Sequence, residues 1–163
     1  MSDAVAITCA TIENALSKSH AYKKVDEGLY VVRQGSAYVM ISVVATNDND
    51  AIVRCLAQLV RGVKLTPALG RKLLTLNARL RLGAFGYVPD GDVITFAHSI
   101  LGGATMDIEE LTATVRDVAL LADEFDDRIV AEGGGMRMQD ILEEEALRNI
   151  QRDLHVGKAT WEN

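Results

Sequence analysis

The chain has 163 residues, of which 48% are hydrophobic, and its formal net charge is −6 at pH 7. A chain of this size buries one ordinary hydrophobic core, so one main domain is expected. No apolar run approaches the roughly 20 residues that cross a bilayer, and the N-terminus lacks the pattern of a secretion signal. We therefore expect a soluble, cytoplasmic protein with no membrane partner.

The first part of the chain predicts a helix followed by a β-meander. Residues 3–17 form the expected helix, with Ser2 or Asp3 as its cap. Three β-branched runs follow, separated by the turn signals Glu27-Gly28 and Gly35-Ser36. These runs cover residues 22–25, 29–34 and 37–46.

Residues 52–60 are best interpreted as a further strand, with a short helix as the alternative. Thr66 and Pro67 then mark a helix start, because proline at the first helical position has no N–H to lose. Residues 83–88 and 92–100 form a predicted hairpin, joined through Pro89-Asp90-Gly91.

The long helix from Asp107 to Ala131 is the clearest predicted element. Asp107 caps its first turn, and Gly133 to Gly135 allow the chain to leave the helix. Its apolar seam recurs in steps of three and four residues. The seam consists of Ile108, Leu111, Val115, Val118, Ala122, Phe125 and Ile129.

Hairpins dominate over parallel crossovers in this order of elements. Antiparallel strands can be joined by short turns, whereas parallel strands need long crossovers. The sequence therefore predicts an α+β domain in two layers, with helices packed on an antiparallel sheet. The predicted order is α-β(3)-α-β(2)-α plus an extra C-terminal helix.

The run from Ala37 to Ala45 is apolar on both faces of the predicted strand, because successive side chains point to opposite sides. Helices cover one face, so the other needs a helix, a second subunit or a ligand. We expect a homodimer or partner surface there. The candidate interaction surface consists of Tyr30, Val32, Tyr38, Met40 and Val44.

The residues that carry chemistry are dispersed. His20, His98 and His155 have no second ligand at metal spacing, and a hydrogen-bonded, partly buried role for His98 is favoured over catalysis. Cys9 and Cys55 are expected to be buried thiols rather than a disulfide or zinc pair. No catalytic, metal or cofactor-binding residue is predicted, and no cofactor is expected.

Charge is unevenly distributed along the chain. Residues 51–89 hold seven basic and no acidic residues, whereas residues 90–163 hold 17 acidic and six basic ones. These regions can satisfy each other within a subunit or across a dimer. Nucleic-acid binding is disfavoured, because a recognised binding motif is missing and the acidic half repels phosphate.

Several segments resemble the bacterial YbjN-like family, which is described as sensory transduction regulators with a fold similar to type III secretion chaperones. The resemblance is good over residues 52–135 and implies a fold in agreement with the order above. It also implies dimers that hold extended client segments, and an amide of Asn77 that ties helix to hairpin. The matching segments are Pro67–Asn77, Leu82–Gly86, Asp90-Gly91, Ile100–Gly102, Asp107–Leu111 and Ala122–Asp127.

A last helix is predicted over residues 136–154, beyond the family core. Its apolar stripe should dock in cis, on a second subunit or on a partner. We therefore divide the chain into a chaperone-like α+β domain, residues 1–135, and a C-terminal helix and tail, residues 136–163. The expected function is a non-enzymatic protein-interaction module, chaperone-like or regulatory; the alternative is a small-molecule-binding protein or enzyme whose pocket the sequence does not show.

Overall fold

A computed structural model describes the backbone of residues 3–46 and 50–159, and side chains as far as residue 152. The helices are α1 (Asp3–Leu16), α2 (Pro67–Asn77), α3 (Ile108–Gly133) and α4 (Met138–Ala159). The strands are β1 (Tyr22–Asp26), β2 (Leu29–Gln34), β3 (Ala37–Ala45), β4 (Ala51–Arg61), β5 (Ala84–Val88), β6 (Val93–Leu101) and β7 (Met136–Arg137).

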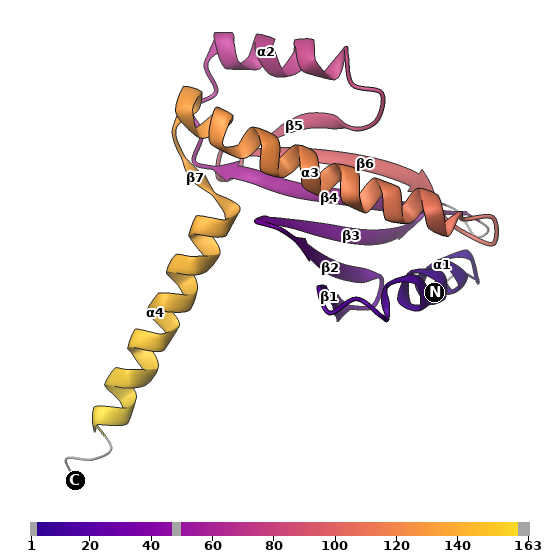
Figure 1. The fold of residues 1–163 in the computed structure, drawn as a ribbon, viewed down its shortest axis with the longest axis horizontal. Helices are drawn as coiled ribbons and strands as arrows, with labels where there is room; N and C mark the ends of the chain where they lie inside the picture. The colour runs from indigo at the N-terminus through magenta and orange to yellow at the C-terminus, as the bar shows by residue number, and fades with distance from the viewer. Residues whose placement is uncertain (1–2, 47–49, 160–163) are drawn as a thin grey trace.

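The strands form one antiparallel sheet in the order β1-β2-β3-β4-β6-β5 (Figure 1). The α+β class and the packing of helices on an antiparallel sheet are thus confirmed, and residues 51–61 form a strand rather than a helix. Two strands are present in addition to those of the predicted order. Residues 22–26 pair with β2, with a shift of register between Lys24 and Asp26. The short strand β7 pairs with Val60 and Arg61 of β4, beyond the stretch of β4 that β3 occupies.

One face of the sheet is covered by α1 and α3 (Figure 1), and we call it the helix-covered face. The predicted seam of α3 is buried against it from Leu111 to Ile129. Rings of Phe85, Phe96 and Phe125 meet edge to face, with centroids about 5 Å apart, in the geometry that aromatic pairs favour. The core lies between these two helices and the sheet.

The predicted helix caps are present. The side chain of Asp107 accepts hydrogen bonds from the N–H groups of Glu109 and Glu110, and that of Thr66 accepts one from Leu69. These oxygens satisfy N–H groups that have no partner within the helix. Both helices therefore begin where the sequence places their caps.

Helix α2 lies along the β5 edge of the sheet. The Asn77 side chain donates to the Phe85 carbonyl at 3.1 Å and accepts from the Phe85 N–H at 2.7 Å. This confirms the expected link between helix and hairpin. Because the amide uses both main-chain groups of Phe85, it takes the place that a neighbouring strand would fill.

The chain leaves α3 through Gly134 and Gly135, both with positive φ. A side chain at Gly135 would approach the Arg61 carbonyl oxygen to 2.6 Å, so this close passage requires glycine. After β7, α4 contacts β3 and β4 and then projects away from the domain (Figure 1). Within the described residues, no helix is both long and apolar enough to span a membrane.

Candidate interaction surface

The tight turn at Gly35 and Ser36 fixes which side chains of β2 and β3 share a face. Gln34 lies opposite Ala37, which places Tyr30 opposite Ile41 and Val31 opposite Met40. Directly opposed residues point to the same side of a sheet. Even-numbered residues of β2 therefore share a face with odd-numbered residues of β3.

This register separates the five predicted surface residues. Tyr30 and Val32 are 0% and 7% exposed and lie on the helix-covered face, so their placement on the candidate surface was wrong. Tyr38, Met40 and Val44 point to the opposite face, which we call the open face. A two-residue hairpin turn sets the register, so the glycine turn was the signal that could have separated the two sets.

The open face is apolar over several adjacent strands. Met40, Val44 and Leu101 are 36%, 54% and 74% exposed. The register adds partly buried apolar residues around them, namely Leu29, Val31, Tyr38, Ile52, Leu56 and Ala97. Contiguous apolar surface of this kind marks interaction sites in soluble proteins.

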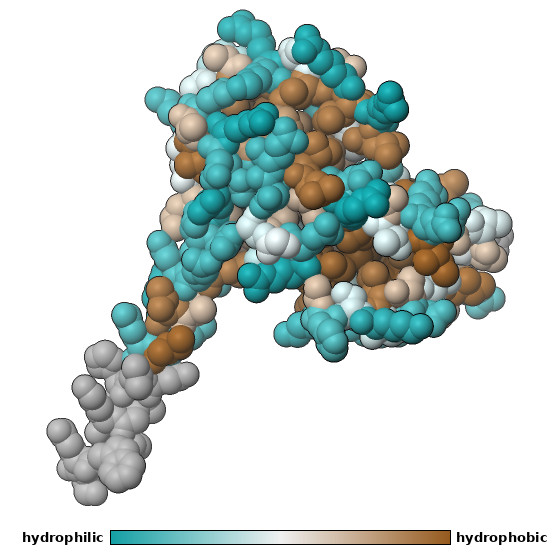
Figure 2. All heavy atoms as spheres, in the orientation of Figure 1, coloured by the Kyte–Doolittle hydropathy of each residue, from teal (hydrophilic) through white to brown (hydrophobic). Residues whose placement is uncertain are grey.

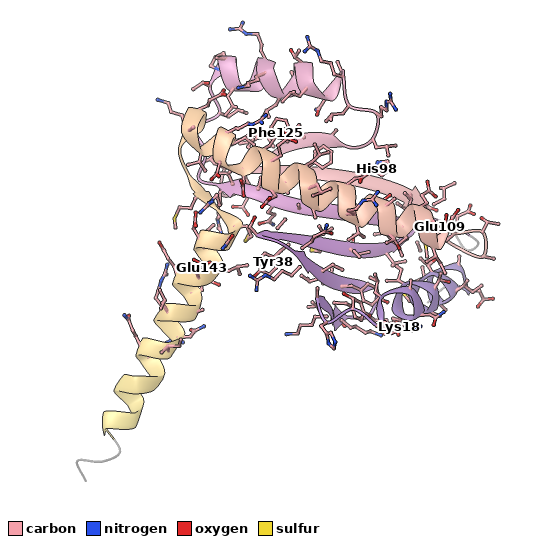
Figure 3. All side chains as sticks on the ribbon, in the orientation of Figure 1. Lys18, Tyr38, His98, Glu109, Phe125 and Glu143 are labelled. Carbon is pink, nitrogen blue, oxygen red and sulfur yellow. The ribbon has the colours of Figure 1, made fainter. Side chains whose placement is uncertain are left out.

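The first two turns of α4 form one wall of a groove on the open face. Its volume is about 310 Å³, and Met138 and Leu142 face β-strand residues across it. Figure 3 shows Tyr38 at the end of β3 near α4. The strand side of the groove is formed by Val31, Tyr38, Met40, Leu56 and Gln58.

The charged side chains on the central strands of this surface have one sign. Strands β2, β3, β4 and β6 carry three charged residues, and all are arginines: Arg33, Arg54 and Arg61. Arg33 and Arg54 lie on the open face by register, and the Arg33 guanidinium sits 5.6 Å from the centre of the Tyr38 ring. An apolar surface with basic residues favours a partner that combines apolar and acidic side chains.

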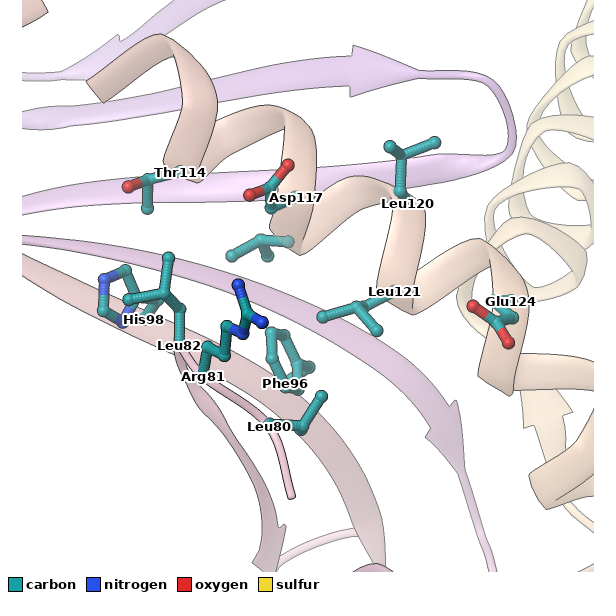
Figure 4. A pocket seen from close by; sticks show the side chains of 11 residues that line it. Leu80, Arg81, Leu82, Phe96, His98, Thr114, Asp117, Leu120, Leu121 and Glu124 are labelled. Carbon is teal, nitrogen blue, oxygen red and sulfur yellow. The ribbon is translucent and has the colours of Figure 1, made fainter. Parts of the chain in front are cut away.

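A second cavity of about 370 Å³ lies on the other side of the molecule, between α3 and the chain leading from α2 to β5. Figure 4 shows Arg81 pointing towards α3, where Asp117 and Glu124 line the opposite wall. His98 also lines it and is partly buried. Sequence reasoning missed this cavity, because residues distant in the chain form it.

Figure 2 shows hydrophobic side chains between α2 and α3 on this side. Leu82 and Leu120 line the cavity and are 52% and 54% exposed. Leu120 lies outside the predicted seam of α3, and that off-seam position is a sequence signal for apolar surface here. The surrounding charges are mixed, unlike those on the central strands of the open face.

Burial suppresses ionisation of the Cys55 thiol and of the Tyr30 hydroxyl. Cys9 and Cys55 are buried free thiols, and burial raises the pKa of Cys55 to about 12. Desolvation, followed by hydrogen bonds with Cys9 and Glu13, raises the pKa of Tyr30. The Cys55 thiol, with its raised pKa, is a poor nucleophile at neutral pH. Among the described residues, no group of three His, Cys, Asp or Glu side chains is arranged to hold a metal ion.

The family follows from comparison with known proteins. Residues 3–141 match TY-Chap1, described as T3SS (YopN, CesT) and YbjN peptide-binding chaperone 1. The chain belongs to this family, as its resemblance to YbjN-like proteins indicated. The matched region includes the whole sheet and ends within the first turns of α4.

A similar solved structure supports the same fold. A chain in the crystal structure of the ExsC-ExsE complex matches with a TM-score of 0.58 and 16% sequence identity. The match covers 79% of this chain and 97% of that chain. No curated protein matches this sequence. At this identity the likeness defines the fold of the domain.

Proposed function

We propose that this protein is a non-enzymatic, homodimeric peptide-binding module of the cytoplasm, with a chaperone-like or regulatory role. The open face receives a segment of a client protein. The observation that carries this proposal is the apolar groove between α4 and the strands, lined by residues such as Met40, Leu56 and Leu142. Membership in a family of peptide-binding chaperones supports it.

The chemistry of the surface suggests what the client segment contains. Burial of apolar side chains contributes about 25 cal/mol per Å² removed from water, so the exposed parts of Met40 and Val44 favour an apolar partner. Arg33 and Arg54 favour acidic residues between the apolar ones. We therefore expect a segment that alternates or interleaves apolar and acidic residues.

The proposal is tested with a library of short synthetic peptides bound to the full-length protein. We expect the bound peptides to be rich in apolar and acidic residues. Met40→Glu and Leu56→Glu place a charge in the groove and should weaken binding at least about tenfold, because the charge must be desolvated. Circular dichroism of each variant verifies that the fold is kept.

Leu120→Glu is the matched control, because Leu120 is exposed and lines the other cavity. It should leave peptide binding unchanged. A library from which no peptide is enriched, or binding that Met40→Glu does not reduce, would contradict the proposal.

The second candidate function is binding of a small molecule in the cavity beside α3. Its apolar floor includes Phe96 and Leu121, and its rim offers Arg81, His98 and Asp117. Such a combination of apolar lining and few polar groups is typical of ligand pockets. If Leu120→Glu abolished ligand binding and Met40→Glu left ligand binding unchanged, the result would favour this candidate.

A further inference from the structure

The outer part of α4 exposes apolar side chains that its own domain does not cover. Leu147 and Ile150 are 60% and 55% exposed. Figure 2 shows hydrophobic side chains on the projecting part of this helix. A helix in a protein gains most of its stability from packing of its apolar face. We therefore expect this stretch to pack on a partner.

One of these exposed residues, Ile150, continues the row that lines the groove, and Leu147 lies next to Ile150 at a spacing of three residues. Met138 and Leu142 line the groove, and Ala146 and Ile150 follow at the same spacing of four residues. Residues four apart are neighbours along one ridge of a helix. The outer turns of α4 therefore present the same kind of surface as the turns that pack on β3 and β4.

The charges of α4 complement those of the open face. Residues 138–152 contain four acidic residues, Asp140 and Glu143 to Glu145, and two basic ones, Arg148 and Arg152, a net charge of −2. Arg148 pairs with Glu144 of the same helix at 2.9 Å. Opposite charges across an interface set orientation and exclude wrong partners.

The end of the open face that carries Val44 and Leu101 is out of reach of the helix in cis. The docked turns of α4 cover the end of the sheet near Tyr38 and Gln58. Val44 and Leu101, farther along the strands, remain 54% and 74% exposed. The helix points away from them (Figure 1), so a helix covering them must come from another chain.

We propose that in the homodimer residues 143–150 of α4 from each copy lie on the open face of the other copy. This inference rests on the homodimer proposed above. Leu147 and Ile150 then pack on the exposed apolar residues of the partner, and Glu143 to Glu145 approach its Arg33 and Arg54. Reciprocal exchange uses the same patch on both copies, as a closed two-fold dimer requires. Because the same face receives clients, a client must displace the helix of the partner.

The first experiment measures the mass of the full-length protein by sedimentation equilibrium. We expect a dimer for the wild type and a monomer for Leu147→Glu combined with Ile150→Glu. Leu74→Glu is the matched control, since Leu74 is 69% exposed on α2. It should stay dimeric. A monomeric wild type, a dimer that the double variant leaves intact, or dissociation of Leu74→Glu would overturn the inference.

A charge exchange tests where the helix binds. Arg33→Glu with Arg54→Glu reverses the face, and Glu143→Arg, Glu144→Arg and Glu145→Arg reverse the helix. Each variant should dimerise at least about tenfold more weakly than the wild type because like charges then meet. Mixing the two variants pairs opposite charges at both contacts and should restore a heterodimer. Absence of that heterodimer would overturn the proposed contact.

Peptide binding separates this inference from the proposed function. The monomeric variant Leu147→Glu with Ile150→Glu has an uncovered open face, so it should bind library peptides more tightly than the wild type. If the variant and the wild type bound peptides equally, the inferred competition between peptide and partner helix would be overturned. The peptide-binding function would remain intact. Loss of peptide binding in both proteins would contradict the peptide-binding function itself.

Discussion

The two faces of the β2–β3 hairpin have similar apolar side chains and different surroundings. Tyr30 and Ile41, on the helix-covered face, are both 0% exposed. Val31 and Met40, one residue along each strand, lie on the open face, where Met40 is 36% exposed. Hydrophobicity alone therefore does not assign a strand residue to the core. The same type of residue serves stability on one face and is available for binding on the other.

The largest expected contrast comes from Ile41→Ala and Met40→Ala, two neighbours on β3. Ile41→Ala leaves a cavity in the core and should lower the free energy of unfolding by about 2–5 kcal/mol. Met40→Ala should lower it by less than about 1 kcal/mol, because Met40 is partly solvated. Urea denaturation of both variants measures the difference. Equal losses would show that the open face belongs to the folding core.

Asn77→Ala tests the edge of the sheet rather than its faces. It leaves the N–H and carbonyl of Phe85 without the side-chain partner and should cost about 1–3 kcal/mol. Asn77→Asp keeps an acceptor for the N–H and loses the donor to the carbonyl, so its cost should be intermediate. Urea denaturation measures both costs, and faster hydrogen exchange of the Phe85 amide in Asn77→Ala locates the effect. Unchanged exchange would speak against the proposed role of the amide.

The smallest expected effect concerns an ion pair at the border of the helix-covered face. Glu13 accepts hydrogen bonds from Lys24 at 2.8 Å and from the Tyr30 hydroxyl at 3.0 Å, and these lower its pKa. A carboxylate whose pKa is depressed by folding stabilises the protein above its unfolded value, about 4.3. That stability is lost as the pH falls through the folded pKa.

Glu13→Gln should therefore be less stable than the wild type at neutral pH, by less than about 1 kcal/mol, because solvent screens this exposed pair. The difference should shrink as the pH falls below about 4. Urea denaturation at a series of pH values measures it. A difference that stays constant with pH would mean that the Glu13 carboxylate does not act through its charge.

The fold was largely predictable because its local signals agree with one another. The seam of α3 has helical period, Asp107 caps it, and glycines end it, so the helix matches its predicted span closely. Thr66 and Pro67 fix the start of α2 in the same way. Each of these features depends on residues close together in the chain, which a sequence displays directly.

The candidate surface was predicted in part, because it depends on strand pairing. The alternation in each strand was recognised, but the sets from β2 and β3 were joined with the wrong parity, which put Tyr30 and Val32 on the surface. The direction of α4 depends on the turn at Gly134 and Gly135, whose positive φ angles a sequence does not specify. The cavity beside α3 arises from elements that meet only in the folded chain.

The amide of Asn77 also limits how sheets of this protein can join. With the main chain of Phe85 engaged by α2, a strand from another molecule finds no open ladder at that position of β5. Unlimited edge-to-edge pairing of sheets requires a free edge strand on both sides of the sheet in every molecule. Addition of a strand at β5 would have to break both hydrogen bonds of Asn77, so growth of a fibre by native sheets is disfavoured at this border.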